Sequence, residues 1–315
     1  MKRTLSIIGA GRVGKTLGKR LRQLGWRIEA VVTKSTATAR AAVRTIGGGT
    51  PLVVSSGGSA GLFTLSEAEG QPREKRAQFK GALAPAVLSA DVILFTTPDD
   101  ALPAIAKALA RMGRSAWRGK VALHTSATLD RSALAPLARF GAFTGSLHPM
   151  QAFGGKVIPK LTGVIFAIEG DRKARRVAQS IARSLGGITV TIATRDKPVY
   201  HAAAVMAAGS AYPTIEAGLE MLMQIGFTRA RAMQTLVPLI RQILDNIVRI
   251  GPRAAWTGPL SRGDYAIVAR HVRALRRYPR EVQQAYAALA LLAGRVLAKN
   301  PAAALRQINR ALAAP

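Results

Sequence analysis

The chain has 315 residues, with 46 Lys and Arg against 16 Asp and Glu, and its formal net charge is +30. It contains no cysteine, which excludes disulfides, thiolate catalysis and cysteine-ligated metals. Hydrophobic residues make up 49% of the chain, and no apolar run approaches the ~18 residues of a membrane span. We therefore expect a cytoplasmic protein of about two domains, with a sizeable core and no metal site.

The positive charge is spread along the whole chain, apart from one basic cluster over residues 270–277. Aromatic residues are only 5% of the composition, so platforms for stacking nucleic-acid bases are few. We expect a positive field that attracts an anionic cofactor and a small-molecule substrate. A membrane partner is not expected, and nucleic acid is disfavoured despite the charge.

A glycine motif lies between the first expected strand and the first expected helix. Residues 2–8 are typical of a short buried strand, and leucines recur at helical spacing after the motif. In this context Gly9 permits a tight turn, Gly11 lets the backbone approach a pyrophosphate, and Gly14 lets the helix pack closely on the strand. The free N–H groups that begin the helix would bind the phosphates. The predicted cofactor contacts are Gly9, Ala10, Gly11, Arg12, Val13 and Gly14.

The second expected strand, Arg27–Thr33, indicates which dinucleotide binds. An NAD site carries Asp or Glu at the end of this strand, about 20 residues after the glycines. This chain has Thr33, Lys34 and Ser35 there, and Glu29 lies at the wrong end of the strand to reach a ribose. A lysine and hydroxyls would bind a 2′-phosphate through charge-assisted hydrogen bonds. We predict NADP rather than NAD; the alternative is that Lys34 is an ordinary solvated charge.

Helices and strands alternate after these elements, as a doubly wound Rossmann-like parallel sheet requires. The expected helices cover 37–46, 101–112, 130–140 and 172–185, and the further strands cover 90–96, 120–124, 142–147, 163–169 and 187–192. From residue 197 onward only helical patterns are found. We expect a cofactor-binding domain over 1–194 and an all-helical domain over 195–315.

Residues 47–81 form a glycine-rich stretch that does not fit this alternation. Within it, 52–54 and 62–65 are candidate short strands. A structureless loop of this length counts against a compact assignment unless it is functional or mobile. We interpret the stretch as an irregular insertion, with a lid as the alternative.

Polar residues follow the expected strands, where open parallel sheets bind their ligands. Thr97, Pro98 and Asp99 would line the nicotinamide half of the cofactor, joined by Ser126. His124 and Gln151 are candidate substrate contacts, and His148 lies directly after an expected strand end. Each histidine could instead make a structural hydrogen bond, but their coincidence at one edge favours function.

The second expected domain opens with a helix that carries further candidates. Positions 197, 201, 205, 208 and 212 share one helical face, which aligns Lys197, His201 and Tyr212. A capping lysine and a histidine that hydrogen-bonds between domains are the alternative. Later, a polar, glycine-rich segment supplies Thr257, Ser261, Arg262 and Asp264. The first three could bind a carboxylate, whereas Asp264 could also simply cap the next helix.

These segments together resemble the Rossmann-like oxidoreductases that carry a C-terminal domain of unknown function, a group similar to pyrroline-5-carboxylate reductase, coenzyme-F420-dependent NADP oxidoreductase and ketopantoate reductase. The resemblance is carried by residues 9–14, 124–126, 147–153, 200–204 and 257–264. It implies an NADP-binding domain and an all-helical C-terminal domain, through which a homodimer would form. The chain departs from this family pattern in two ways. Its glycine-rich insertion is longer than expected, and Gly209-Ser210 stands where relatives often carry an Asn that contacts substrate or nicotinamide.

We therefore expect an NADP-dependent oxidoreductase that transfers a hydride to or from a C=O or C=N carbon. The substrate would be small and anionic, of the 2-oxo acid or cyclic imine type. The protein must then supply orientation and a proton. Histidine suits this proton transfer near neutral pH, which favours His201 or His148 over Lys197 unless the lysine is desolvated. The alternative is a dinucleotide-binding sensor or scaffold protein without turnover.

Overall fold

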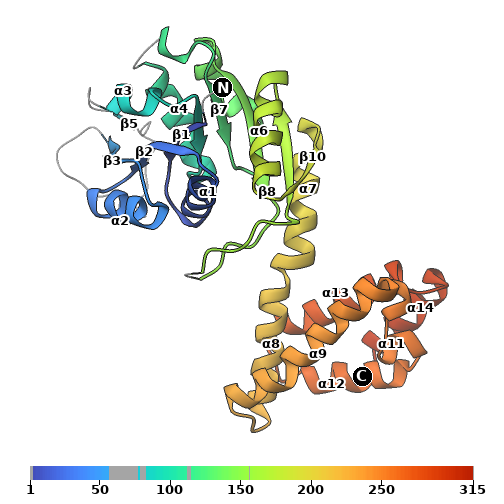
Figure 1. Ribbon diagram of the computed structural model, residues 1–315. Coiled ribbons are helices and arrows are strands. Elements are labelled where there is room, and N and C mark those ends of the chain that lie inside the picture. Colours follow the sequence, from blue (N-terminus) through green and yellow to red (C-terminus); the bar gives the residue numbers. More distant parts are fainter. Residues whose placement is uncertain (1–2, 57–76, 79–82, 112–114, 156, 315) are drawn as a thin grey trace, which may run out of the picture. The chain divides into compact units, whose positions relative to one another are not determined.

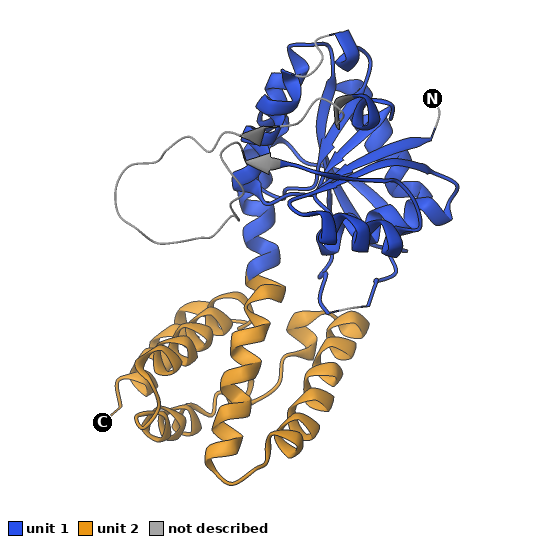
Figure 2. Ribbon diagram, turned by 90° about the vertical axis from the view of Figure 1, so that its left-hand side faces the viewer, with its two compact units in different colours: residues 1–205 blue, residues 206–315 orange. Residues whose placement is uncertain are grey.

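The computed structural model describes residues 3–56, 77–78, 83–111, 115–155 and 157–314. The chain divides into two compact units, Met1–Val205 (unit 1) and Met206–Pro315 (unit 2), which Figure 2 shows in blue and orange. Helix α7 (Lys197–Ala204), which we expected to open the second domain, lies within unit 1.

Unit 1 is built on an eight-stranded sheet of order β10-β9-β8-β7-β6-β1-β2-β3 (Figure 1). The strands are β1 (Thr4–Ile8), β2 (Arg27–Thr33), β3 (Thr50–Val53), β6 (Val92–Phe95), β7 (Val121–His124), β8 (Phe143–Pro149), β9 (Ile165–Gly170) and β10 (Ile188–Thr191). The Rossmann-like class is confirmed, because six neighbouring strands of this sheet pair in parallel, in the order β3, β2, β1, β6, β7 and β8. One correction concerns β9, which is antiparallel to β8. The described residues between these two strands form no crossover helix, which a parallel pair would need.

Helices cover both faces of this sheet, which explains why its strands are apolar on both sides. One core joins the sheet to α1 (Arg12–Gln23), α2 (Thr36–Ile46) and α6 (Arg172–Ser184). The second core joins it to α3 (Leu83–Leu88), α4 (Leu102–Ala110) and α5 (Ala135–Ala138). In β1, Ile7 belongs to the first core and Ile8 to the second, since successive strand residues point to opposite faces.

Two helices are shorter than expected because each begins as a tighter 3₁₀ turn. The segment expected as a helix over 101–112 is η1 (Asp99–Ala101) followed by α4, and residue 112 lies outside the described residues. The segment expected over 130–140 is η3 (Arg131–Leu134) followed by the single turn of α5. The Asp130 carboxylate accepts a hydrogen bond from the backbone N–H of Ser132, so Asp130 caps η3, which begins at Arg131.

The glycine-rich stretch begins with a strand of the main sheet. β3 pairs in parallel with β2, so residues 50–53 extend the sheet rather than form an insertion. After it, β4 (Ser55–Ser56) and β5 (Ala77–Gln78) form a small antiparallel pair. The strand expected over 62–65 and the alternative of a lid lie outside the described residues.

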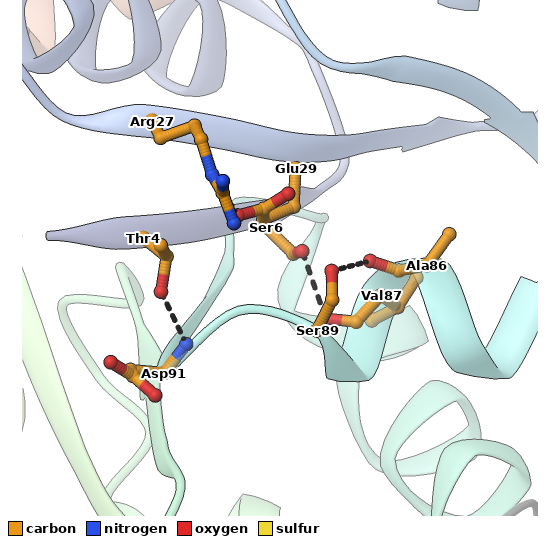
Figure 3. A network of polar contacts seen from close by, with 8 residues as sticks. All are labelled: Thr4, Ser6, Arg27, Glu29, Ala86, Val87, Ser89 and Asp91. Atoms are coloured by element: carbon orange, nitrogen blue, oxygen red, sulfur yellow. Dashed lines mark hydrogen bonds and ion pairs between the residues drawn. The ribbon is translucent and has the colours of Figure 1, made fainter. Parts of the chain in front are cut away.

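Polar side chains of β1 bond to the segment that leads into β6 (Figure 3). Thr4 Oγ1 accepts a hydrogen bond from the backbone N–H of Asp91 at 2.8 Å, and Ser6 Oγ donates to the carbonyl of Val87 at 2.9 Å. Both side chains are buried, so these bonds offset their desolvation. They help to hold β1 beside β6, at the point where the strand order reverses and doubly wound sheets bind ligands.

Unit 2 is helical throughout its described residues. After the π-helical turn η5 (Val205–Gly209), its helices are α8 (Ala211–Gln224), α9 (Arg229–Ile250), α10 (Pro252–Ala255), α11 (Pro259–Arg262), α12 (Tyr265–Leu275), α13 (Arg280–Val296) and α14 (Pro301–Leu312). The absence of strands after residue 197 is thus confirmed for the part of the chain that the structure describes. Within that part, no helix combines the length and apolar character needed to cross a membrane.

Candidate functional site

The three glycines of the motif differ in the space around them, and the differences fit a dinucleotide-binding turn. Gly9 has a φ of +90°, and a Cβ there would lie 2.9 Å from the carbonyl carbon of Thr96. A Cβ on Gly14 would lie only 2.4 Å from the Gly9 carbonyl oxygen, so helix and turn are in direct contact. At Gly11 a Cβ would meet no atom within 4 Å. The backbone at Gly11 therefore borders open space, as the approach of a pyrophosphate requires.

Helix α1 starts at this turn without a side-chain cap. Gly11 is its N-cap residue, and no acidic residue lies in the first turn. The first backbone N–H groups and the positive end of the helix dipole are therefore available to an anion. The Arg12 guanidinium donates from Nη1 to the carbonyl oxygen of Phe153 at 2.9 Å. Ala10 is buried.

The end of β2 presents a lysine beside two hydroxyls that shape the turn. Thr33 Oγ1 donates to the carbonyl of Ser35 at 2.8 Å, and Ser35 Oγ accepts from the backbone N–H of Thr38 as the cap of α2. Lys34 is exposed. Glu29 forms an ion pair with Arg27, with 2.5 Å between Oε1 and Nε (Figure 3).

The end of β6 contacts the glycine turn directly. Thr96 Oγ1 donates to the carbonyl oxygen of Gly9. The neighbouring Thr97 Oγ1 is buried and has no hydrogen-bond partner among the described residues. Because a buried hydroxyl without a partner is costly, Thr97 is suited to bind a ligand at this position. Pro98 is exposed and precedes η1, so its ring faces solvent.

The carboxylate of Asp99 organises the loop after β7. Its Oδ2 accepts hydrogen bonds from Ser126 Oγ at 2.6 Å and from Thr128 Oγ1 at 3.0 Å. Ser126 Oγ also accepts from the backbone N–H groups of Thr128 and Leu129. The Ser126 hydroxyl was expected to contact the cofactor. Its one hydrogen and both of its acceptor positions are instead occupied by these hydrogen bonds.

His124 occupies a position that differs from the expected substrate contact. Its side chain is completely buried, its Nδ1 accepts from the backbone N–H of Ser126, and its Nε2 lies 3.0 Å from the carbonyl oxygen of Asp130. Burial, followed by the positive charge of Lys197, lowers the pKa of His124 to about 4. The ring is neutral, and both of its nitrogens are engaged, so in this structure it orders the loop rather than faces a ligand.

Lys197 is the most unusual group at this edge of the sheet, because only 2% of it is exposed. Its Nζ donates to Ser146 Oγ at 2.9 Å and to the carbonyl oxygen of Ser126 at 3.5 Å. Burial lowers the pKa of Lys197, and the negative charges of Glu169, Asp130 and Asp99 oppose that shift only in part. An ammonium group has three N–H bonds, so two acceptors leave one for a ligand.

His148, Tyr200 and His201 form an aromatic cluster beside Lys197. His148 lies within β8 rather than after its end, and its Nδ1 is 3.2 Å from Tyr200 Oη. Its ring meets those of Tyr200 and His201 edge to face, with centroids 5.7 Å and 6.4 Å apart. The Nδ1 atom of His201 is buried and has no partner in the described part of the chain. Gln151, two residues beyond β8, is partly buried.

The single stripe expected along the helix after residue 197 is interrupted. Lys197 and His201 share the face of α7 that meets β8, but residues Val205–Gly209 form a π-helical turn. The wider turn changes the register, so the spacing of α-helical residues does not carry the stripe on to Tyr212. Tyr212 lies in unit 2.

The polar segment of unit 2 is organised by its own hydrogen bonds. Ser261 Oγ donates to the carbonyl of Gly258 at 2.8 Å, and Arg262 Nε lies 3.0 Å from Asp264 Oδ2. Asp264 precedes α12 but makes no side-chain capping bond. Thr257 is exposed. A role for these residues in substrate binding stays a prediction.

Two participants were not expected from the sequence. Tyr200 is three residues after Lys197 and adjacent to His201, and that spacing on one helical face was the available signal. Ser146 precedes His148 by two residues in the same strand, so the two side chains point to the same face. No sequence motif implies that Tyr200 contacts His148 or that Ser146 contacts Lys197. Only the tertiary structure therefore identifies these two residues as part of the site.

The architecture and the site define a doubly wound, Rossmann-like dinucleotide-binding fold followed by a helical unit. Residues 164–293 match the model of a family described as "Domain of unknown function (DUF2520)". This match and the Rossmann-like unit confirm the resemblance noted from the sequence, in which such a fold carries a C-terminal domain of unknown function. No curated protein matches the chain by sequence.

Solved structures similar to this chain share its fold over nearly its whole length. A Bacteroides fragilis protein described as a candidate NADP oxidoreductase has 20% identity and a TM-score of 0.67, over 91% of this chain and 95% of its own. A Thermotoga maritima protein has 20% identity and a TM-score of 0.62, over 97% and 98%. A reductive aminase from Aspergillus terreus, in complex with NADPH and ethyl levulinate, has 15% identity and a TM-score of 0.64, over 97% and 99%.

Proposed function

We propose that the protein is an NADP-dependent oxidoreductase that transfers a hydride to or from a C=O or C=N carbon of a small anionic substrate. The observation that carries this proposal is the joint placement of two features in unit 1. The glycine turn follows β1, and the cluster of Lys197, His148, Tyr200 and His201 lies at the ends of β7 and β8. The strands β1, β6, β7 and β8 are neighbours in the sheet and all run parallel. Both features therefore lie at the carboxyl ends of the strands, at the same edge of the sheet.

The residues present fit a nicotinamide dinucleotide. The open space at Gly11 admits a pyrophosphate, and the uncapped start of α1 offers it backbone N–H groups. The orphaned Thr97 hydroxyl lies at the end of β6, near the reversal of strand order. Lys34 at the end of β2 suits a 2′-phosphate, which supports NADP over NAD. The bound cofactor would supply the hydride, a function that the A. terreus reductive aminase's NADPH complex supports by analogy of fold.

The proposed proton donor is Lys197. The sequence favoured histidine unless this lysine was desolvated, and its burial meets that condition. A lowered pKa makes the ammonium a stronger acid, and its third N–H is left for a substrate atom. In the direction of reduction, Lys197 would donate a proton to the substrate heteroatom as the carbon accepts hydride, leaving a neutral amine that must regain a proton before the next turnover. His201 is the second candidate, because its Nδ1 lacks a partner among the described residues.

Purified protein should be assayed for substrate-dependent NADPH oxidation with 2-oxo acids and cyclic imines, and NADPH binding should be titrated in parallel. The proposal predicts tight NADPH binding and turnover with at least one of these substrate classes. NADPH binding without consumption in any assay would favour the alternative, a sensor or scaffold protein. The absence of dinucleotide binding would contradict both.

We further propose that the protein forms a homodimer through unit 2. Helix α9 exposes apolar side chains along its length, which are Leu239, Ile243, Leu244, Ile247, Val248 and Ile250. Such a row on a 22-residue helix is typical of an interface. Light scattering should give the mass of two chains, and Leu244→Asp with Val248→Asp should give one. A monomeric unmodified protein at micromolar concentration would contradict the proposal.

A further inference from the structure

The hydrogen bond between Tyr200 and His148 joins the two elements that carry the proposed site. Tyr200 lies on α7 and His148 on β8, with 3.2 Å between Oη and Nδ1. The planes of the two rings are nearly perpendicular, at 89°. A neutral imidazole carries one proton on two nitrogens, so the partner of Nδ1 decides what Nε2 can do.

The available partners favour the tyrosine as the donor. Tyr200 Oη has no other hydrogen-bond partner in the described residues. If His148 donated from Nδ1, the phenolic hydrogen would have no acceptor among the described residues. If Tyr200 donates, both groups are satisfied at this contact, and the ring proton resides on Nε2. Nε2 is not among the buried unpartnered atoms and bonds to no described residue, so it is left for a ligand.

The charges around His148 oppose a second proton on its ring. Burial, then the electrostatic effects of Lys197 and His201, lower the pKa of His148 to about 4, with a smaller effect of His124. Asp99 is the group that opposes this shift. The ring is thus neutral near pH 7 and cannot deliver a proton as an imidazolium. A neutral imidazole N–H can still stabilise negative charge that develops on a substrate oxygen.

We propose that Tyr200 is a positioning residue that fixes His148 as the Nε2–H tautomer, and that His148 thereby donates a hydrogen bond to the substrate oxygen. This inference rests on the proposed function and adds to it an electrophilic group distinct from the proton donor. It also assigns a carbonyl substrate to the site, because an oxygen that gains negative charge benefits most from a neutral N–H donor beside a cationic Lys197. A protonated imine would instead be repelled by that lysine.

The chain offers a matched control in unit 2. His271 on α12 and Tyr286 on α13 form the same kind of pair, with 2.8 Å between Nδ1 and Oη and centroids 5.9 Å apart. Tyr286→Phe removes the same hydroxyl from the same kind of contact, but in unit 2, whereas the glycine turn and the Lys197 cluster belong to unit 1. Any effect that depends on the site should therefore appear in Tyr200→Phe and be absent in Tyr286→Phe.

The tautomer can be measured in the full chain without cofactor or substrate. The protein has four histidines, so ring ¹⁵N resonances can be assigned with single His→Gln variants. We expect His148 to show an unprotonated, hydrogen-bonded Nδ1 and a protonated Nε2 at pH near 7. In Tyr200→Phe the Nδ1 resonance should move to the position of a free acceptor and the second tautomer should appear. Tyr286→Phe should change only His271. A His148 that is protonated at Nδ1, or unaffected by Tyr200→Phe, would overturn the inference.

Turnover provides the second measurement. Tyr200→Phe should lower kcat about tenfold on a 2-oxo acid, the equivalent of one hydrogen bond, with unchanged NADPH affinity. Tyr286→Phe should leave both values unchanged. Loss of NADPH affinity in Tyr200→Phe, or undiminished kcat, would overturn the role in substrate orientation. If the unmodified protein binds NADPH but consumes none, the proposed function fails, while the tautomer measurement still decides the role of Tyr200.

Discussion

Lys197 Nζ lies 2.9 Å from Ser146 Oγ, and this contact carries an ammonium group into a region of unit 1 that water hardly reaches. Burying a charged group without an ion-pair partner is unfavourable, and no described carboxylate lies within salt-bridge distance of Lys197. Glu169, itself buried, acts on the lysine only from farther away. An arrangement that opposes stability in this way is typical of a functional group.

Replacing this lysine should separate chemistry from cofactor binding. Lys197→Met keeps a long apolar side chain but removes the amine, so turnover should fall by roughly 10²–10⁴ while NADPH affinity stays nearly constant. Steady-state kinetics and a fluorescence titration of NADPH measure the two quantities. His201→Ala is the comparison. If that variant loses the larger share of turnover and Lys197→Met retains most of it, the proton comes from His201.

Replacing a glycine of the motif by valine should have different effects at Gly11 and at Gly14. Gly11→Val should abolish dinucleotide binding and leave the fold intact, because its side chain would enter open space. Gly14→Val should destabilise unit 1 itself, since even a Cβ would lie 2.4 Å from the Gly9 carbonyl oxygen. Thermal unfolding and an NADPH titration of each variant distinguish the two effects. Micromolar NADPH binding by folded Gly11→Val would show that the turn does not hold the pyrophosphate.

Cofactor preference should depend on the charge at the end of β2. The unmodified protein should bind NADPH at least about tenfold more tightly than NADH, a difference of about 1.4 kcal/mol. Lys34→Glu should reverse or abolish this preference by repelling the 2′-phosphate. Lys107→Glu changes the net charge equally from an exposed position on α4 and should leave the preference intact. Equal affinities of the unmodified protein for NADPH and NADH would contradict the assignment of NADP.

Stability should fall in mild acid because of His124. Its pKa is about 4 in the folded protein against an ordinary 6.5, so between these values the unfolded chain takes up a proton that the folded chain does not. The free energy of unfolding should therefore be constant above pH 7 and decrease as the pH falls from 6.5 to 4, by about 3 kcal/mol for this residue. Urea titrations across that range measure the decrease.

His124→Gln should reduce that acid dependence, because glutamine can donate a hydrogen bond but does not titrate in this range. The slope that stays includes His148, whose pKa is also lowered to about 4. His271→Gln alters an exposed histidine on α12 and should leave the slope unchanged. A decrease of the same size in His124→Gln would assign the acid sensitivity to other groups, of which the partly buried His148 is the first to test.

Local pattern was sufficient for most of the architecture. The glycine motif predicted the turn between β1 and α1, because a strand, a tight turn and a helix are determined by residues that are neighbours in the chain. Hydrophobic runs likewise predicted the parallel strands, and the helical patterns after residue 197 predicted an all-helical unit 2. Where local pattern was ambiguous, as between the 3₁₀ turn η3 and a longer helix, the boundaries were wrong.

The chemistry of the site depended on contacts between distant segments. That β9 runs antiparallel to β8 follows from a connection without a crossover helix, which hydrophobicity alone does not reveal. That Lys197 is buried, that His124 has no nitrogen left for a ligand and that His148 bonds to Tyr200 all arise where strand ends and α7 meet. Residue type defines what a lysine or a histidine can do. Its burial and its partners decide which protonation state it holds, because desolvation and neighbouring charge act through space and not along the chain.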